Sequence, residues 1–318
     1  MKLYGCIPGA DPFDAEETGI GVGLGNFDGV HVGHAALLDE LRTQCAAYGI
    51  PSVVYTFENH PANVLFPEHR TELIISNAKK AALIKEKGID GIYFEHFDRA
   101  YASMDAEEFA EKILVKTLHA RVVVVGHNYS FAKEGTGSPE ILKQLGACYG
   151  FETVVIPAVT VEGEVVSSTL LRSVVKSGDA ERYYLYTGRR YSIPGVVEYG
   201  RRVGRKLGFP TANILPRDGF ALPESGVYIT ETRIGGKLYG GITNIGSNPT
   251  FGTNRTTVET HLFHYNENLY GQTIEVFFIK KIRGEIVFRS PEELAERVHR
   301  DIGTASRYFE ERKAKENL

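Results

Sequence analysis

The strongest constraint on the fold is a change in sequence pattern close to Gly188. Before this point, short apolar runs alternate with amphipathic helical patterns. The run Arg121–Gly126 contains four consecutive valines, which is typical of a strand that is buried on both faces. Alternating strands and helices predict an open parallel sheet that is covered by helices on both sides. The first half is therefore expected to be an α/β domain spanning residues 1–186.

The elements of this half follow from local patterns and capping signals. The expected strands are Gly19–Phe27, Pro51–Phe57, Gly91–Phe94, Arg121–Gly126 and Thr153–Pro157. The expected helices are His31–Tyr48, Asn77–Lys87, Asp105–Leu118 and one that opens at Ser138-Pro139-Glu140.

After Gly188 the strand-like runs are separated by Gly, Pro and Asn turns, and this spacing predicts an antiparallel barrel or sandwich. A final helix is expected, because Ser290-Pro291 combines an N-cap with proline at the first helical position. We assign residues 187–318 to this second domain. Its expected strands are Ser192–Val197, Gly226–Arg233, Lys237–Thr243, Thr257–Phe263 and Thr273–Ile279.

Composition excludes several classes of protein. The chain has 318 residues, of which 42% are hydrophobic, so each of two domains can bury a core. Residues 1–186 carry 16 Lys and Arg against 25 Asp and Glu (net −9), and residues 187–318 carry 20 against 15 (net +5). Neither balance favours nucleic acid or a membrane surface as partner. Without an apolar run of about 18 residues, a signal peptide or a CxxC pair, the chain is expected to be cytoplasmic. Self-association is left open.

The segment Gly25–His34 leaves a strand, turns on glycines and enters a helix. A helix N-terminus suits a phosphate, because its unpaired N–H groups carry a partial positive charge. His31 and His34 stand where either ring could donate to a phosphoryl oxygen, and Gly33 lets the backbone approach without a Cβ. The segment therefore favours a polyphosphate site.

Other interpretations of the two histidines have less support. A zinc site would need further ligands and a supporting shell, whereas a simple helix cap remains possible. The spacing of Gly21, Gly23 and Gly25 does not match G-x-G-x-x-G, and the chain has no G-x-x-x-x-G-K-[ST]. Dinucleotide-fold and P-loop hypotheses therefore lose support.

A second candidate site lies in the basic stretch Arg201–Lys206, which holds four Arg or Lys among glycines. Such a loop could be a solvated turn, or it could wrap around a polyphosphate. Phe209-Pro210 is expected to pin the chain so that Thr211 and Asn213 present oxygens on one side. Neutral oxygens beside a polyphosphate suit Mg²⁺, which keeps most of its waters.

Gly25–His34 resembles the G-x-F-D-G-x-H-x-G-H signature of prokaryotic bifunctional riboflavin kinase/FAD synthetases. The similarity extends from about Gly19 to Asp301, with the family's motifs in order. It implies a Rossmann-like nucleotidylyltransferase domain with a parallel sheet, followed by an antiparallel β-barrel riboflavin kinase domain ending in a helix. The further matching segments are Thr56–Pro61, Val125–Phe131, Ser167–Arg172, Gly208–Asn213, Gly226–Tyr228, Asn244–Phe251, Val258–Thr260 and Leu269–Gly271.

This resemblance implies two reactions: the second domain converts riboflavin and ATP to FMN, and the first converts FMN and ATP to FAD and pyrophosphate. The implied catalytic residues are His31, His34, Arg172 and Glu259, the last as general base. Implied ATP-binding residues are Gly25, Asn26, Phe27, Asp28, Gly33, Ser167, Ser168, Thr169, Gly204, Arg205, Lys206 and Gly208. Implied flavin-binding residues are Phe57, His60, Pro61, Asn128, Phe131, Asn248 and Arg255, and the implied Mg²⁺ ligands are Thr211 and Asn213.

Taken without the resemblance, two of these segments have simpler interpretations. Ser167–Thr169 would be a helix-capping run, and Glu259 would be a strand carboxylate paired with Arg255. The chain also departs from the family at Ala132, where a glycine is usual. Two alternative functions therefore stay open: a riboflavin kinase with weak or lost FAD synthetase activity, and a non-catalytic flavin-binding regulator.

Overall fold

The computed structural model describes the chain except for residues 12–18, 201–203, 205–206, 249–254 and 317–318. The side chains of residues 247, 248, 255 and 316 also lie outside the description. The chain forms two compact units, Met1–Leu171 and Arg172–Leu318. The predicted domain boundary between residues 186 and 187 stays a prediction.

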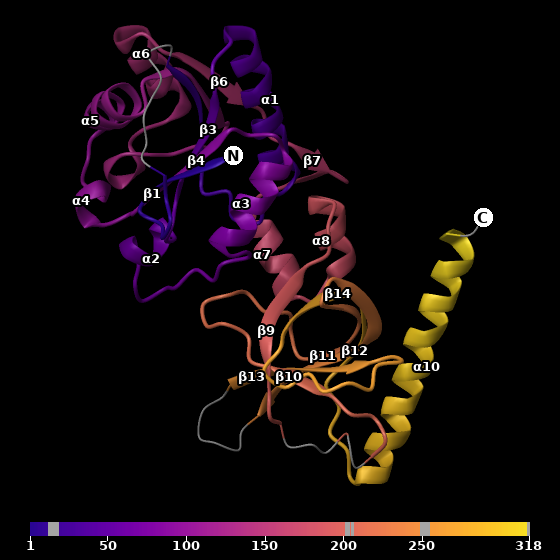
Figure 1. Ribbon diagram of the computed structural model, residues 1–318. Coiled ribbons are helices and arrows are strands. Elements are labelled where there is room, and N and C mark those ends of the chain that lie inside the picture. Colours follow the sequence, from indigo (N-terminus) through magenta and orange to yellow (C-terminus); the bar gives the residue numbers. More distant parts are fainter. Residues whose placement is uncertain (12–18, 201–203, 205–206, 249–254, 317–318) are drawn as a thin grey trace. The chain divides into compact units, whose positions relative to one another are not determined.

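The first unit is built on a six-stranded sheet in the order β1-β4-β3-β2-β5-β6, in which all neighbouring strands are parallel (Figure 1). The predicted α/β fold with a parallel sheet is thereby confirmed. The strand β1 at one edge was not predicted. The strands are β1 Lys2–Gly5, β2 Ile20–Leu24, β3 Ser52–Phe57, β4 Gly91–Glu95, β5 Ala120–Gly126 and β6 Glu152–Ile156.

Helices flank this sheet and begin where the sequence carries capping residues. For example, Ser138 accepts a hydrogen bond from Ile141 N, and Gly49 ends α1 with φ 64°. The helices are α1 Val32–Tyr48, α2 Pro61–Leu65, α3 Asn77–Glu86, α4 Arg99–Ala102, α5 Ala106–Phe109, the π-helix η1 Ala110–Thr117, the short 3₁₀ turn η2 Lys133–Gly135 and α6 Pro139–Tyr149. A small hairpin, β7 Thr160–Val161 and β8 Glu164–Val165, precedes α7 Ser168–Lys176.

Glycines in β2 allow α1 to pack closely on the sheet. A Cβ at Gly21 would stand 2.1 Å from Cys45 Sγ, and one at Gly23 would stand 3.0 Å from Leu41 Cδ2. Across the sheet, the valines of β5 are fully buried. Gly21 and Gly23 therefore serve the packing of α1 on the sheet.

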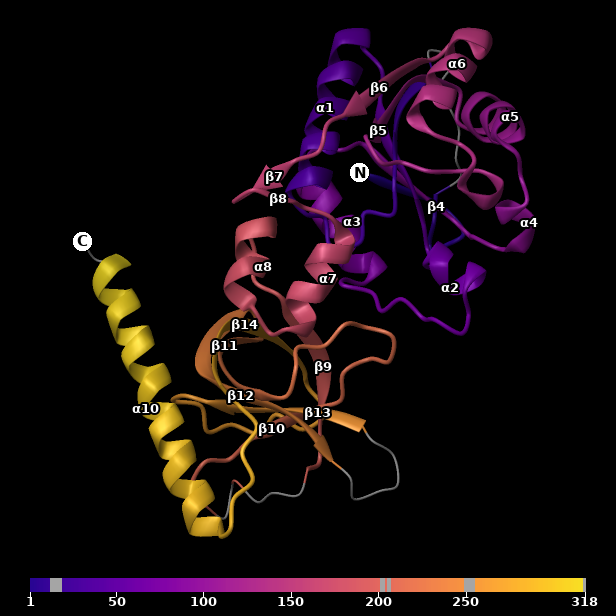
Figure 2. The ribbon, with the colours of Figure 1, turned by 180° about the vertical axis from the view of Figure 1, so that it is seen from behind.

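The second unit contains a closed antiparallel barrel in the order β10-β13-β12-β11-β14-β9, with β9 also pairing with β10 (Figure 2). The predicted antiparallel barrel and the predicted final helix of the chain are confirmed. The short strand β10 was not predicted. The elements are α8 Ala180–Thr187, β9 Ser192–Glu198, β10 Ala212–Ile214, β11 Gly226–Ile234, β12 Lys237–Asn248, β13 Arg255–Leu262, β14 Thr273–Gly284 and α10 Pro291–Glu316.

The two faces of the barrel wall carry different chemistry. Thr230, Thr243 and Thr260 are fully buried and form a ladder of hydroxyl contacts across β11, β12 and β13, at 2.7 and 2.9 Å. On the other face, apolar residues of the wall pack against α10, whose Ala305 is fully buried in the contact. Since side chains alternate along a strand, residues next to the threonines, such as Glu259, face the side of α10.

Candidate active sites

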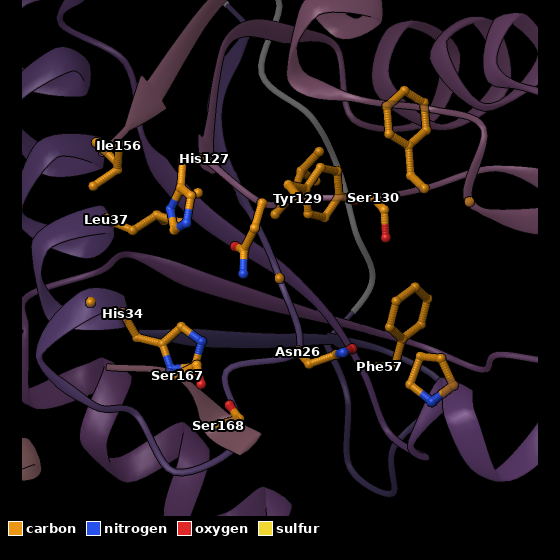
Figure 3. A pocket seen from close by; sticks show the side chains of 18 of the residues that line it. Asn26, His34, Leu37, Phe57, His127, Tyr129, Ser130, Ile156, Ser167 and Ser168 are labelled. Carbon is orange, nitrogen blue, oxygen red and sulfur yellow. The ribbon is translucent and has the colours of Figure 1, made fainter. Parts of the chain in front are cut away.

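A cavity of about 440 Å³ opens in the first unit at the carboxyl ends of the sheet strands. Gly25 follows β2, Phe57 ends β3, Gly126 ends β5 and Ile156 ends β6, and all four line the cavity. This edge is where open α/β sheets bind ligands. In Figure 3, His34, Ser167 and Ser168 gather on one side of the cavity and Phe57 lies on another.

His31 forms the N-cap of α1. Its Nδ1 accepts hydrogen bonds from Gly33 N (3.1 Å) and His34 N (3.3 Å). These bonds require Nδ1 to be unprotonated, so the neutral ring carries its proton on Nε2. The ring stacks on His34 with a centroid distance of 3.8 Å. Capping and phosphate binding are thus compatible, because the cap uses only one ring nitrogen.

Gly33 is required by this cap. A Cβ at Gly33 would stand 3.1 Å from both Cε1 and Nδ1 of His31. The ring would then have to move away from the two N–H groups that it accepts. The glycine therefore makes room for the imidazole as well as for a ligand.

A second helix begins at the same cavity. Ser167 Oγ accepts from Leu170 N (3.2 Å) at the start of α7, and Ser168 Oγ donates to Asp28 O (2.7 Å). Ser167, Ser168 and Thr169 all line the cavity. The amino ends of α1 and α7 thus converge there, and both direct partial positive charge towards a bound anion.

Another side of the cavity is aromatic. Phe57 meets Phe97 and Tyr101 edge to face, with centroid distances of 5.1 and 5.3 Å, and all three line the cavity. Phe131 and Tyr129 also line the cavity, and their rings stack with a centroid distance of 5.7 Å. Burial raises the pKa of Tyr101, so its phenol stays neutral. Such a surface suits a flat, largely apolar ring system.

The second unit has its own cavity, of about 240 Å³, between the barrel wall and the first turns of α10. Glu259 and Asn244 line it from neighbouring strands, where they are register partners. Gly204 and Thr211 line it from the segment before and at β10. Glu259 is also the register partner of Asn213 on β10. The strand register therefore places a carboxylate beside amide and hydroxyl groups.

Comparisons with known proteins decide between flavin chemistry and other nucleotide chemistry. A family model described as FAD synthetase matches residues 14–170, and one described as riboflavin kinase matches residues 187–309. A bifunctional riboflavin kinase/FMN adenylyltransferase of Buchnera aphidicola subsp. Schizaphis graminum is 34% identical over 292 residues, covering 91% of this chain and 93% of its own. Its Bacillus subtilis counterpart is 31% identical over 294 residues, covering 90% and 91%.

The chain belongs to the family of bifunctional riboflavin kinases/FMN adenylyltransferases. A solved structure from Streptococcus pneumoniae, described as a macrolide-efflux protein, has the same fold, with a TM-score of 0.85 and 28% identity over 92% of this chain and 95% of that one. Among the residues that the structure describes, no helix is both long and apolar enough to span a membrane.

Twelve of the residues predicted for the FMN adenylyltransferase site line the first cavity together. They are Gly25, Asn26, His31, Gly33, His34, Phe57, Pro61, Asn128, Phe131, Ser167, Ser168 and Thr169. Their roles as ligands of ATP or flavin stay predictions, but the fold brings them to one place from four separate segments of the chain.

Four other predicted residues of this half do not line that cavity. The buried Asp28 carboxylate accepts from Ile74 N (3.0 Å) and Ile75 N (3.2 Å), and Phe27 is fully buried. His60 caps α2 through a bond from Ala62 N (3.2 Å). Arg172 lies in α7 as the first residue of the second unit. Asp28 and His60 thus bond to nearby backbone N–H groups, and their predicted roles as ligands stay predictions.

Sequence reasoning missed a corner of the first cavity. Figure 3 shows His127 beside Leu37 and Ile156, residues that come from the end of β5, from α1 and from β6. The signal that could have found them is the common end of parallel strands, since His127 directly follows β5 and Ile156 is the last residue of β6. The loop after β5 also holds Ala132, at φ 63° and ψ 178°. This conformation is essentially restricted to glycine, the residue that the resemblance implies at this position.

The predicted kinase residues are brought together in part. Gly204, Thr211 and Glu259 line the second cavity. Asn213 is the register partner of Glu259, and its side chain packs against Gly200, where a Cβ would stand 2.5 Å from Asn213 Nδ2. Gly208 adopts φ 89° just before Phe209. Arg205 and Lys206 lie outside the described residues, as do the side chains of Asn248 and Arg255.

The chemistry of these donors fits the divalent metal that a kinase uses with ATP. Asn213 and Glu259, on the paired strands β10 and β13, and Thr211, directly before β10, offer oxygen atoms, which Mg²⁺ prefers. In the described part of the chain there is no group of three or more His, Cys, Asp or Glu able to hold a metal.

The far wall of the kinase cavity was also missed. Arg283 Nε donates to Asp301 Oδ2 (2.8 Å), which ties the end of β14 to α10, and Asp301 is buried. Both residues line the cavity, together with Phe288 and Val298. No local sequence motif marks this pairing, because its partners meet only when α10 packs on the barrel.

Proposed function

We propose that the second unit phosphorylates riboflavin to FMN and that the first unit adenylylates FMN to FAD, each with ATP and Mg²⁺. The observation that supports the synthetase assignment is one cavity with two helix amino ends on one side and an aromatic surface on the other. A polyphosphate and an isoalloxazine ring need these two surfaces within reach of each other. The proposed location is the cytoplasm.

In the first unit, an FMN phosphate oxygen attacks the α-phosphorus of ATP. The bond from this phosphorus to the bridging oxygen breaks, and pyrophosphate leaves. The step needs alignment and charge neutralisation rather than a covalent nucleophile. His31 Nε2–H, His34 and the amino ends of α1 and α7 would supply donors to the phosphates. Arg172 is proposed to neutralise the leaving pyrophosphate.

The aromatic side of the same cavity would hold the flavin. Phe57 and Phe131 offer ring faces and edges, Pro61 offers an apolar surface, and Asn128 offers hydrogen bonds to the polar edge of the isoalloxazine. The neutral phenol of Tyr101 adds to the apolar wall. This arrangement would direct the ribityl phosphate towards the helix amino ends.

In the second unit, Glu259 would take the proton from the ribityl 5′-hydroxyl as that oxygen attacks the γ-phosphorus, and ADP leaves. Thr211 and Asn213 would hold the Mg²⁺ of MgATP, and this ion supplies neutralisation of phosphate charge. The apolar surface formed by Ile242 of β12 and Val298 of α10 would take the isoalloxazine ring. Glu259 and its neighbours on β10 thus stand where both substrates would meet.

A time course supplied with riboflavin, ATP and Mg²⁺ tests the proposal. We expect FMN to appear first and FAD to follow with release of pyrophosphate. A second reaction supplied with FMN and ATP tests the first unit alone. If riboflavin gives FMN but neither reaction gives FAD, only the kinase assignment stands. If no combination of substrates gives a product, both assignments are overturned and a flavin-binding regulator is favoured.

A further inference from the structure

Lys80 on α3 is a cation buried beneath the carboxyl end of β3. Only 6% of its surface is exposed. Its Nζ donates to Thr56 Oγ1 and to Phe57 O, both at 3.3 Å, and lies 5.8 Å from the centroid of the Phe94 ring. A buried ammonium group is costly, so its contacts call for an explanation.

The two hydrogen bonds of Lys80 lead to two different sides of the first cavity. Thr56 Oγ1 in turn donates to Asn26 O (3.1 Å), and Asn26 lines the cavity directly after Gly25. The other acceptor is the carbonyl of Phe57, whose ring belongs to the aromatic surface. One ammonium group thus holds the turn that leads to α1 and also the strand end that carries the flavin-side ring.

We propose that Lys80 is a positioning residue for adenylyl transfer, which holds the nucleotide side and the flavin side of the cavity at the separation that the reaction needs. This inference rests on the proposed FMN adenylyltransferase function of that cavity. Lys80 forms no bond with substrate in this role, and it acts through Asn26 and Phe57.

The electrostatics argue against a purely structural role. Burial lowers the pKa of Lys80 to about 8, and the negative charge of Asp28 opposes this shift without cancelling it. Glu58 and His60 are the other titratable side chains that line the small cavity containing Asp28 and Lys80. An apolar side chain of similar length would avoid the cost of burying the charge. If Lys80 only filled space, its replacement by Met would be neutral or stabilising and without effect on catalysis.

The first test compares Lys80→Met with Lys85→Met, a control at an exposed position of the same helix. Misalignment of two bound substrates lowers kcat more than it raises KM, so for K80M we expect kcat for FAD formation to fall about 30-fold. KM for FMN and for ATP should stay within about threefold, and FMN formation from riboflavin should be unchanged, as should both activities of K85M. The thermal midpoint of K80M should not fall.

The second test uses Thr56→Val and the pH profile. T56V removes the bond to Asn26 O but keeps Lys80, so kcat for FAD formation should fall by about tenfold with little change in KM. In the wild type, kcat for FAD formation should decline above about pH 8 as Lys80 loses its proton. The K80M variant should not show this decline, and neither should FMN formation by the wild type.

These outcomes separate the inference from the function on which it rests. If wild-type protein makes no FAD from FMN and ATP, the proposed function fails. If the wild type makes FAD and K80M retains the wild-type kcat, the positioning role is wrong. It is also wrong if T56V and K80M raise only KM and leave kcat unchanged. A K80M protein that loses stability, combined with a fully active T56V, would also overturn the role.

Discussion

The two cavities, each proposed to bind a polyphosphate next to a flavin, are built from different parts of the polypeptide. In the first unit the phosphate side is made by the amino ends of two helices, with His31 capping one of them. In the second unit it is made by strand register, which sets Glu259 beside Asn213 and Asn244. Helix ends bring fixed partial charges, whereas strand register brings side-chain oxygens that suit a metal.

This contrast explains why the net charges of the two halves do not predict their ligands. Residues 1–186 are acidic overall, yet their proposed site relies on backbone N–H groups and imidazoles, which do not enter a count of formal charge. Residues 187–318 are basic overall, and four of those cations fall within Arg201–Lys206. Local geometry therefore matters more than the balance of a domain.

The largest expected effect separates the two sites by removing the proposed base. Glu259→Gln keeps the size of the side chain but cannot accept a proton, so FMN formation should fall by about 10²–10⁴-fold. FAD formation from supplied FMN should be unchanged. Product assays with each substrate measure both, and Glu267→Gln, at an exposed position, is the control. Equal loss of both reactions would contradict the assignment of one site to each unit.

The next prediction separates the capping of α1 by His31 from its proposed donation of a hydrogen bond to phosphate. Asparagine is a good N-cap, so His31→Asn should keep α1 intact while removing the Nε2 donor. FAD formation should fall by about 10²-fold and FMN formation should be spared. His31→Ala should lose the same activity and also about 1 kcal/mol of stability. Unfolding curves and FAD assays distinguish them, and an active H31N would show that the histidine is only a cap.

A smaller effect is expected from Gly33→Ala. The added methyl would stand 3.1 Å from two atoms of the His31 ring, so the ring must shift by a few tenths of an ångström. We expect about a tenfold loss of FAD formation, with an unchanged kinase. The control is Gly49→Ala. A Cβ there would meet no atom within 4 Å, so this variant tests only the backbone strain of an alanine at φ 64°. Greater loss of FAD formation in G49A than in G33A would argue against the ring displacement.

The smallest effect concerns Ala132. Its φ of 63° with ψ 178° is a conformation that costs a residue with a Cβ about 1–3 kcal/mol. Ala132→Gly should therefore raise the free energy of unfolding of the first unit by about 1 kcal/mol. FAD formation should stay within about threefold of wild type. Denaturant unfolding tests this, and a destabilised A132G would mean that the loop gains more from the methyl group than it loses to strain.

Much of this organisation was predictable from local patterns. The Gly25–His34 segment specifies strand, turn and helix within ten residues, and each of its signals acts between near neighbours. The strands β1 and β10 were missed, because four and three residues are too short to show a period. For β10, the pairing with β9 and β13 supplies the order that its own sequence does not indicate.

The candidate sites show the same division. Motif residues such as His31 and Ser167 were found because the signals for a helix start lie in adjacent residues of the sequence. Arg283 and Asp301 were not, since they are paired only by the packing of α10 on the barrel. The role of Asp28 at the ligand stays a prediction, whereas its hydrogen bonds from Ile74 N and Ile75 N were not predicted. That contact spans more than forty residues, so no local pattern could reveal it.

The amino-acid sequence by itself determined the change from alternating strands and helices to a barrel, the helix starts and the motifs that place this chain in its family. These features depend on side-chain periodicity and on capping, which operate over a few residues. Only the tertiary structure decided that two helix ends share one cavity, that Glu259 faces α10 rather than the barrel interior, and that Lys80 reaches both Thr56 and Phe57. Those outcomes depend on strand order, register and packing between distant segments, which no short stretch of sequence contains.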